Sequence, residues 1–173
     1  MQPALAAGAA TEAANYSDAV DVFGDLPYAR RFDRESLLGL AQISAGAATV
    51  ECYTGRHIRD VSQQRGVLLT ALLDEAGMKT LPRAQCKQLI VAVHAADGYV
   101  CLFTWHELYN SPIGERAMLL VEQDGEILPI AAGGVQLTSL GDLRLGPRSA
   151  VAVTAIEVRR WVAGPGQGGP RAL

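Results

Sequence analysis

Long hydrophobic runs are missing from the sequence. Its apolar stretches, such as Leu89 to Val93 and Ala117 to Val121, fall short of the roughly 18 consecutive apolar residues that a membrane-spanning helix needs. Positive charge is also scarce, because 15 basic residues are scattered among 18 acidic ones and the net charge is −3. This distribution lacks the basic patch that binds nucleic acid. We therefore expect neither a membrane span nor a nucleic-acid partner.

The sequence also has few cysteines, and their number, three, is odd. Cys52, Cys86 and Cys101 allow one intrachain bridge at most, which excludes a disulfide framework. We interpret Cys86 and Cys101 as structural residues. The sequence also lacks paired histidine and cysteine at zinc spacing, a P-loop and a G-x-S-x-G motif, so the common zinc, nucleotide and serine-hydrolase functions have no support.

The cellular compartment is not settled by the cysteines. Residues 1–14 are rich in alanine but carry no basic segment and no strongly apolar run, so they are not a complete signal peptide. They are compatible with the remnant of one. We expect a periplasmic or exported protein, with the cytoplasm as the alternative.

Length and composition indicate one domain. A chain of 173 residues that is 49% hydrophobic can bury a sizeable core but is short for two ordinary domains. Its last residues contain too much glycine and proline to form a helix or strand with regular backbone hydrogen bonds. We expect a flexible N-terminal tail at 1–15, a folded domain at 16–161 and a flexible Gly/Pro-rich tail at 162–173.

The polar and apolar pattern predicts several strands and few helices. Leucines at positions 68, 69, 72 and 73 mark one face of a helix that Gly77 ends, and Asp33 is placed to cap another helix. The predicted helices span 34–41, 67–76 and, as a single turn, 106–109; the predicted strands span 20–22, 48–53, 88–95, 99–104, 117–123, 126–130, 136–140 and 150–160. Because strands and helices do not strictly alternate, we expect an α+β fold with mixed, mostly antiparallel sheets. We interpret His94, in an apolar strand, as a hydrogen-bonded core residue.

Cys52 stands out chemically, because it ends a predicted strand and Arg56, His57 and Arg59 follow closely. Cations beside a thiol lower its pKa, and the thiolate is the form that binds soft metals or attacks electrophiles. The alternative is that Cys52 packs as a small hydrophobic residue. The spacing defines a candidate site and leaves both interpretations open.

The order of several segments resembles the molybdopterin-binding domain of the sulfite oxidase family. The segments are the Cys52 region, Gly66 to Gly77, Ala96 to Tyr99, Asp124 to Pro129 and Ala155 to Val158. The resemblance implies the molybdopterin-binding fold, with the Cys52 thiolate as a molybdenum ligand and Cys52, Arg56 and His57 as catalytic residues. It also implies contacts to molybdopterin from Cys52, Tyr53, Thr54, Gly55, Arg56, Gly133, Gly134, Arg144 and Arg148.

The sequence departs from the family pattern near these residues. Gly55 lies three residues after Cys52 where the family has glycine two after, and no asparagine follows. The stretch from Gly133 to Leu137 lacks the family's proline and arginine, and residues 152–154 lack its Lys-Trp pair. A phosphate that leaves water needs cationic or N–H partners. Arg144 and Arg148 are either substitutes for these anchors or solvated loop arginines.

Two functions follow from the resemblance and its departures. The first is a molybdenum-cofactor oxidoreductase that acts on a small, anionic substrate beside Arg56 and His57 and exchanges electrons with a separate protein. The second is a cofactor-free binding module that keeps the fold and uses the same pocket for a small anion, or the same surface for a protein. We interpret Tyr99 as a packing residue, and His106 either as a residue at the mouth of the site or as a capping or surface residue.

Overall fold

The computed structural model describes residues 15–162 and 164. The two predicted tails lie outside these residues except for positions 15, 162 and 164. The strands are β1 (Ala19–Gly24), β2 (Arg30–Asp33), β3 (Ile43–Ala45), β4 (Ala48–Glu51), β5 (His57–Val61), β6 (Gln64–Leu68), β7 (Leu89–Ala95), β8 (Val100–Thr104), β9 (Ala117–Gln123), β10 (Glu126–Ile127), β11 (Gln136–Ser139) and β12 (Val153–Arg160). The α-helices are α1 (Arg34–Gly39), α2 (Leu69–Glu75), α3 (Arg83–Cys86) and α4 (Trp105–Tyr109), and the 3₁₀ turns are η1 (Met78–Thr80), η2 (Pro112–Glu115), η3 (Ile130–Ala132) and η4 (Gly146–Arg148).

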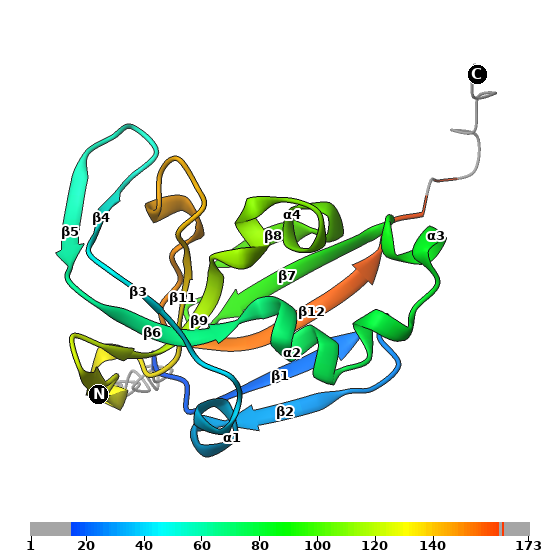
Figure 1. The fold of residues 1–173 in the computed structure, drawn as a ribbon, viewed down its shortest axis with the longest axis horizontal. Helices are drawn as coiled ribbons and strands as arrows, with labels where there is room; N and C mark the ends of the chain where they lie inside the picture. Colours follow the sequence, from blue (N-terminus) through cyan, green and yellow to red (C-terminus); the bar gives the residue numbers. More distant parts are fainter. Residues whose placement is uncertain (1–14, 163, 165–173) are drawn as a thin grey trace, which may run out of the picture.

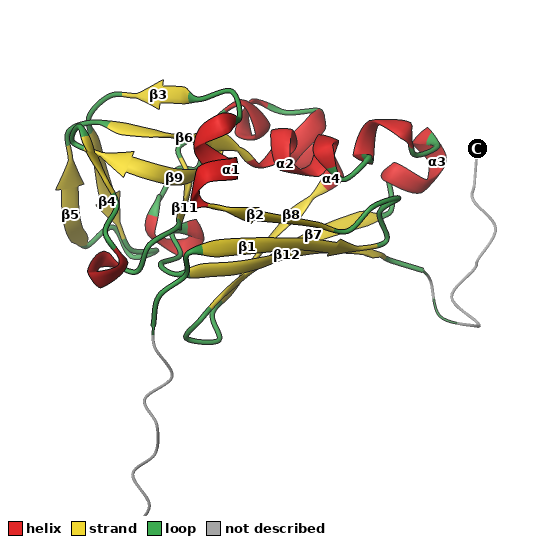
Figure 2. Ribbon diagram, turned by 90° about the horizontal axis from the view of Figure 1, so that it is seen from below, coloured by secondary structure: helices red, strands yellow, loops and turns green. Residues whose placement is uncertain are grey.

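The first sheet has the strand order β2-β1-β12-β7-β8 (Figure 1). β1 and β12 run parallel, and the other neighbouring pairs are antiparallel. Along β7, buried and half-buried residues alternate, so Val91 and Val93 face the core while Ile90 and Ala92 face outward. The helices α1, α2 and α4 lie on one side of this sheet, and no described element covers the other side (Figure 2).

The second sheet is antiparallel and has the order β10-β9-β6-β3, with β11 also paired to β9. β4 and β5 form a separate antiparallel hairpin that projects from this end of the molecule (Figure 1). The chain leaves β11 into a loop, residues 140–149, that lies beside the hairpin. Two segments far apart in the sequence therefore meet at one end of the fold.

Within the described residues, the larger of two hydrophobic clusters joins the two sheets and the helices. Helix α1 contributes Leu37, α2 contributes Leu72, and the sheets contribute Leu119, Phe103 and Ile156, all buried. This arrangement confirms the predicted α+β fold with mixed, mostly antiparallel sheets and few helices. Within the described residues, no helix is long and apolar enough to cross a membrane.

Two predictions that each depend on a single residue, the cap of α1 and the end of α2, are confirmed. The carboxylate of Asp33 caps α1 by accepting a hydrogen bond of 2.8 Å from the Ser36 backbone N–H. Gly77 follows α2 with a φ of +92°, a conformation that glycine adopts without the steric cost of a Cβ. Both signals act within a few residues, which is why the sequence alone reveals them.

The predicted helix at 67–76 begins later than expected. Val67 and Leu68 are the end of β6, where they pair with Leu119 and Met118 of β9, and α2 starts at Leu69. The leucine pattern describes the helix correctly but cannot show that a strand runs directly into it. The pattern also missed β2, β3, β5 and β6, which are short strands that exist because a neighbouring strand pairs with them.

His94 is not a core residue, which corrects the interpretation from the sequence. Its side chain lies on the outward face of β7, where it is 34% exposed and its Nε2 lies 3.1 Å from Oε2 of Glu157. The apolar run of β7 correctly predicts a strand inside a sheet. It does not reveal that the described helices cover only one face of that sheet.

Candidate functional site

Cys52 lies at the tip of the β4–β5 hairpin. Its backbone N–H donates to the Arg56 carbonyl and its carbonyl accepts from the Gly55 N–H, both at 2.9 Å. Gly55 has a φ of +81°, so the tight loop depends on a residue without a side chain. The sequence thus places a cysteine directly after a strand, as predicted, and holds it there by main-chain hydrogen bonds.

The Cys52 thiol is half-buried, and its Sγ lies 3.0 Å from Oγ1 of Thr54. This hydrogen bond is the main reason why the pKa of the Cys52 thiol lies below its ordinary value. Partial desolvation opposes the shift, while the backbone and the charge of Arg56 add to it. Cys52 is therefore an accessible thiol with raised thiolate character, not a buried hydrophobic residue.

The other residues predicted to be catalytic point to other partners. His57 is exposed, and its Nε2 lies 3.0 Å from Oδ2 of Asp60. Asp60 also accepts a hydrogen bond of 2.8 Å from Thr49, and these contacts lower the pKa of its carboxyl. The described residues show no hydrogen bond between His57 and Cys52. Arg56 is exposed at the hairpin tip.

The loop after β11 packs against the hairpin tip. Arg144 forms an ion pair with Glu51, and its guanidinium lies over Gly55, where an added Cβ would be 3.4 Å from Nη2. At Gly146, a side chain would collide with the carbonyl of Glu51. We call the combined surface of residues 51–56 and 142–148 the Cys52 surface. It brings together the predicted residues Cys52, Tyr53, Thr54, Gly55, Arg56, Arg144 and Arg148.

The Arg148 guanidinium forms hydrogen bonds and ion pairs within the protein. Its guanidinium donates to both oxygens of Asp142, at 2.7 and 2.5 Å, and to Oε1 of Glu107 at 3.0 Å. It also stacks over the ring of Phe103, with 4.3 Å between Cζ and the ring centroid. The side chain is 17% exposed. Arg148 is thus neither a solvated loop arginine nor a cation with free donors for a phosphate.

A cavity of about 600 Å³ lies between the hairpin tip and the loop. It is lined by Tyr53, Asp142, Leu143, Arg144, Pro147 and Arg148. Tyr53 and Leu143 stand out on its rim, 85% and 99% exposed. The lining does not include Cys52, and the carboxylates of Asp142 and Glu51 neutralise the arginines on the protein side.

Gly133 and Gly134 lie elsewhere. They precede β11, whereas the loop with Arg144 and Arg148 follows it, so the four residues of that strand separate the two groups. Gly133 accepts a hydrogen bond of 3.0 Å from the Ser17 N–H, and a side chain at Gly134 would collide with the Ser17 carbonyl. Their backbone holds the start of the domain against β11 and does not meet the Cys52 surface.

These observations decide whether the residues fit molybdopterin. A metal held by Cys52 needs the thiol to face the cavity, and the pterin phosphate needs uncommitted cationic donors. The thiol does not line the cavity, Arg148 is bound to Asp142 and Glu107, and Arg144 is paired with Glu51. The site does not fit the cofactor as the resemblance implied.

Sequence reasoning missed the carboxylates that decide this electrostatic balance. Glu51 directly precedes Cys52, and Asp142 lies six residues before Arg148. The only sequence signal was that each acidic residue is close to an arginine or to the cysteine. Their pairing across the hairpin and loop depends on the tertiary fold.

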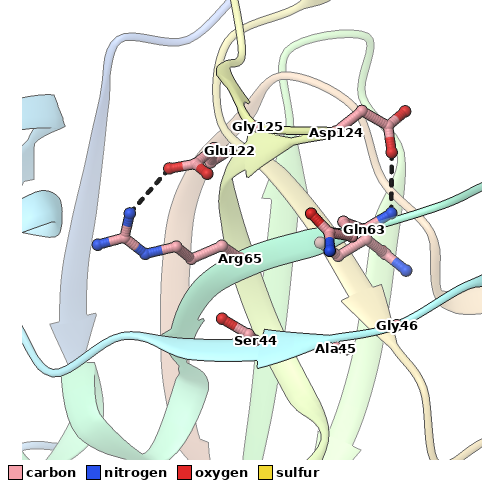
Figure 3. A pocket seen from close by; sticks show the side chains of 9 residues that line it. Ser44, Ala45, Gly46, Gln63, Arg65, Glu122, Asp124 and Gly125 are labelled. Atoms are coloured by element: carbon pink, nitrogen blue, oxygen red, sulfur yellow. Dashed lines mark hydrogen bonds and ion pairs between the residues drawn. The ribbon is translucent and has the colours of Figure 1, made fainter.

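A second, polar cavity of about 230 Å³ lies at the base of the same hairpin (Figure 3). On one side, Arg65 and Glu122 form an ion pair of 2.9 Å. On the other, Asp124 accepts hydrogen bonds from the backbone N–H groups of Gln63 and Ser62 at 2.8 and 3.1 Å. These polar groups fix the turn between the strands, which gives them a structural role.

The fold and the site define an α+β domain of two packed sheets with one projecting hairpin and loop. No family model and no curated protein matches the sequence. Among solved structures, the chain is similar to the sulfane dehydrogenase SoxCD from Paracoccus pantotrophus, with 19% sequence identity and a TM-score of 0.63. The match covers 84% of this chain but only 38% of that chain. At this identity the likeness shows a related fold alone.

Proposed function

We propose that the chain is a cofactor-free binding module on a sulfite-oxidase-like fold, and that the Cys52 surface binds a partner protein. The observation that carries this proposal is that two large apolar side chains, Tyr53 and Leu143, line the same cavity and are 85% and 99% exposed. Exposed apolar patches with a polar rim mark interaction sites, and tyrosine is enriched among the residues that dominate binding energy.

The charges around this patch favour a protein over a small anion. Arg144 is paired with Glu51, and Arg148 with Asp142 and Glu107, so the cavity offers little net positive charge to an anion. The two loops are also anchored to each other through Gly55 and Gly146. An anchored surface loses little conformational entropy when it binds.

Comparative capture tests this proposal. Full-length wild-type protein, Tyr53→Ser with Leu143→Ser, and a control with Ile127→Ser and Ile130→Ser would serve as baits in extracts of the native source. The control removes two apolar side chains that are 48% and 51% exposed but belong to β10 and η3, outside the Cys52 surface. We expect a partner that wild type and control retain and that the Tyr53/Leu143 variant loses, with purified partner binding at least about 30-fold weaker. Equal capture by all three baits would contradict the proposal.

A molybdenum-dependent oxidoreductase is the second candidate. One observation favours it: the accessible Cys52 thiol, with its lowered pKa, lies at the end of β4 where the resemblance puts a metal ligand. A small anionic substrate, an electron-transfer partner and an exported location belong to this candidate.

Molybdenum content decides between the candidates. Wild type and Cys52→Ser would be purified from a host that makes molybdopterin and measured by mass spectrometry. Near-stoichiometric metal that the variant loses would establish the second candidate and refute the first. Absence of metal from both proteins is what the binding module predicts.

A further inference from the structure

The outward face of the first sheet carries a hollow that is separate from the Cys52 surface. The strand register places Glu157, Ala92 and Leu102 in one row across β12, β7 and β8. Ile90 and His94 lie before and after Ala92 on the same face of β7. The helices pack on the other side of the sheet, and none of the elements within 15–162 covers this face (Figure 2).

The composition of this face is unusual for a surface exposed to water. Outward positions of a half-covered antiparallel sheet are normally polar, but here Ile90, Ala92 and Leu102 are neighbours, and Leu102 is 57% exposed. Ala92 has the smallest side chain of the group and forms the floor between larger ones. The resulting groove has a volume of about 620 Å³, within the roughly 300–1,000 Å³ of small-molecule sites.

Trp161 lines the groove directly after the end of β12. Its backbone N–H donates to the Gln88 carbonyl at 2.7 Å, which fixes the chain beside the start of β7. Its side chain is 71% exposed and lines the groove together with Val162. The indole offers both apolar surface and an N–H donor to a bound molecule.

The polar side chains that line the groove offer more hydrogen-bond donors than acceptors. Both oxygens of Glu157 are engaged, one by Nε of Arg159 at 2.6 Å and the other by His94 at 3.1 Å. The terminal nitrogens of Arg159 make no hydrogen bond to the described residues, and Arg160 also lines the groove. Arg160 Nε donates to Oε1 of Gln88 at 2.7 Å. Among the lining residues the two guanidinium groups outnumber the single Glu157 carboxylate, so the groove is complementary to an acceptor with one negative charge.

We propose that this groove binds a small amphiphile with an apolar body and a single carboxylate. The body lies over Ala92 between Ile90 and Leu102, against Trp161, and the carboxylate accepts hydrogen bonds from Arg159. This site does not depend on the function of the Cys52 surface.

Titration calorimetry with octanoate, 1-octanol and acetate tests the site on the full-length chain. Three variants separate its parts: Ala92→Phe fills the floor, Arg159→Gln removes the charge, and Arg31→Gln is the matched control. Arg31 lies on the same sheet and is paired with Asp21, away from the groove. Circular dichroism would verify that each variant is folded.

We expect octanoate to bind wild type and the Arg31 control equally and with one-to-one stoichiometry, and acetate not to bind. Ala92→Phe should weaken octanoate at least about tenfold by loss of apolar burial. Arg159→Gln should weaken octanoate about tenfold while leaving 1-octanol unchanged, because only the carboxylate uses the charge. Absence of saturable octanoate binding, or binding that Ala92→Phe does not change, would overturn the proposal.

Two other occupants are distinguishable in the same experiment series. A second copy in the groove would give a dimer in sedimentation equilibrium that Ala92→Phe dissociates. A segment of the same chain would form an intramolecular cross-link to the photo-reactive residue p-benzoylphenylalanine in place of Leu102. Either result in the absence of ligand would overturn the amphiphile site.

Discussion

At the scale of single residues, Arg144 and Arg148 show how burial sets the role of the same side chain in one loop. Arg144 is 49% exposed and pairs with Glu51 at the surface. Arg148 is 17% exposed and holds Asp142, itself 12% exposed, together with Glu107. Exposed ion pairs contribute little stability, whereas a broken buried pair leaves an uncompensated charge.

Arg148→Met should therefore destabilise the protein much more than Arg144→Met. We expect a loss of about 2–4 kcal/mol in the free energy of unfolding for Arg148→Met, near the low end because Glu107 is partly solvated. Arg144→Met should cost about 1 kcal/mol or less. Urea denaturation of both variants measures the difference, and equal losses would refute a structural role for Arg148.

A second prediction at the scale of single residues concerns the pKa of the Cys52 thiol. Because the Thr54 hydroxyl stabilises the thiolate, Thr54→Val should raise the thiol pKa and slow alkylation by iodoacetamide several-fold at pH 7. The pH–rate profile of alkylation, with the modified cysteine identified by mass spectrometry, measures this pKa. Thr49→Val is the control, because Thr49 bonds to Asp60 instead. Identical profiles for wild type and Thr54→Val would show that the hydrogen bond is not formed in solution.

At the scale of elements, the sequence predicts structure well where a signal is local. The Asp33 cap and the helix end at Gly77 each depend on neighbouring residues, and each is confirmed. β6 was missed because its strand character comes from pairing with β9 and β3, and its end overlaps the leucine pattern of α2. A helical pattern contains no information about a partner strand distant in the sequence.

Gly134 gives a prediction for the junction between the N-terminal segment and β11. Gly134→Ala should be far more destabilising than Gly98→Ala, although both glycines have positive φ values, +72° and +88°. Gly98 has open space around it, so the alanine there costs about 1 kcal/mol in backbone strain alone. At Gly134 the new Cβ would also collide with the Ser17 carbonyl, and we expect at least twice that loss. Thermal unfolding of the two variants compares them, and similar midpoints would argue against the Ser17–Gly134 bridge.

At the scale of the whole molecule, the residue pattern alone predicts only the contiguous part of the candidate site, and the resemblance adds Arg144 and Arg148. Residues 52–56 lie together because one short loop contains them. Arg144 joins them because the loop after β11 returns to the hairpin, and Gly133 does not because it precedes the same strand. The pairing of carboxylates with these arginines follows from tertiary packing. So does the outer face of the first sheet, which no described element covers.

The shifted pKa values predict how the free energy of unfolding depends on pH. We expect a plateau at intermediate pH, with a fall on the acid side (the acid limb) and a fall on the alkaline side (the alkaline limb). Hydrogen bonds and ion pairs hold the pKa values of Asp33, Asp60, Asp124 and Glu157 below their ordinary values of 3.8 for Asp and 4.5 for Glu. A carboxyl with a lowered folded pKa stabilises the protein above the unfolded pKa, and that contribution is lost as the pH falls through the folded value. The acid limb should therefore begin below about pH 4.5.

The alkaline limb arises from buried groups whose pKa values are raised, whereas the acid limb arises from carboxyls whose pKa values are lowered. Burial raises the pKa of Cys101 from 9.0 to about 11, and it raises the pKa of Tyr109 as well. A group with a raised folded pKa stabilises the protein below its unfolded pKa, so the contribution of Cys101 should be lost between about pH 9 and 11. Urea denaturation from pH 3 to 11 measures both limbs. Asp124→Asn should flatten the acid limb, and Cys101→Ala with Tyr109→Phe should flatten the alkaline limb, because the unfolded state then gains no favourable ionisation. An unchanged alkaline slope in the double variant would mean that other groups ionise when the core opens.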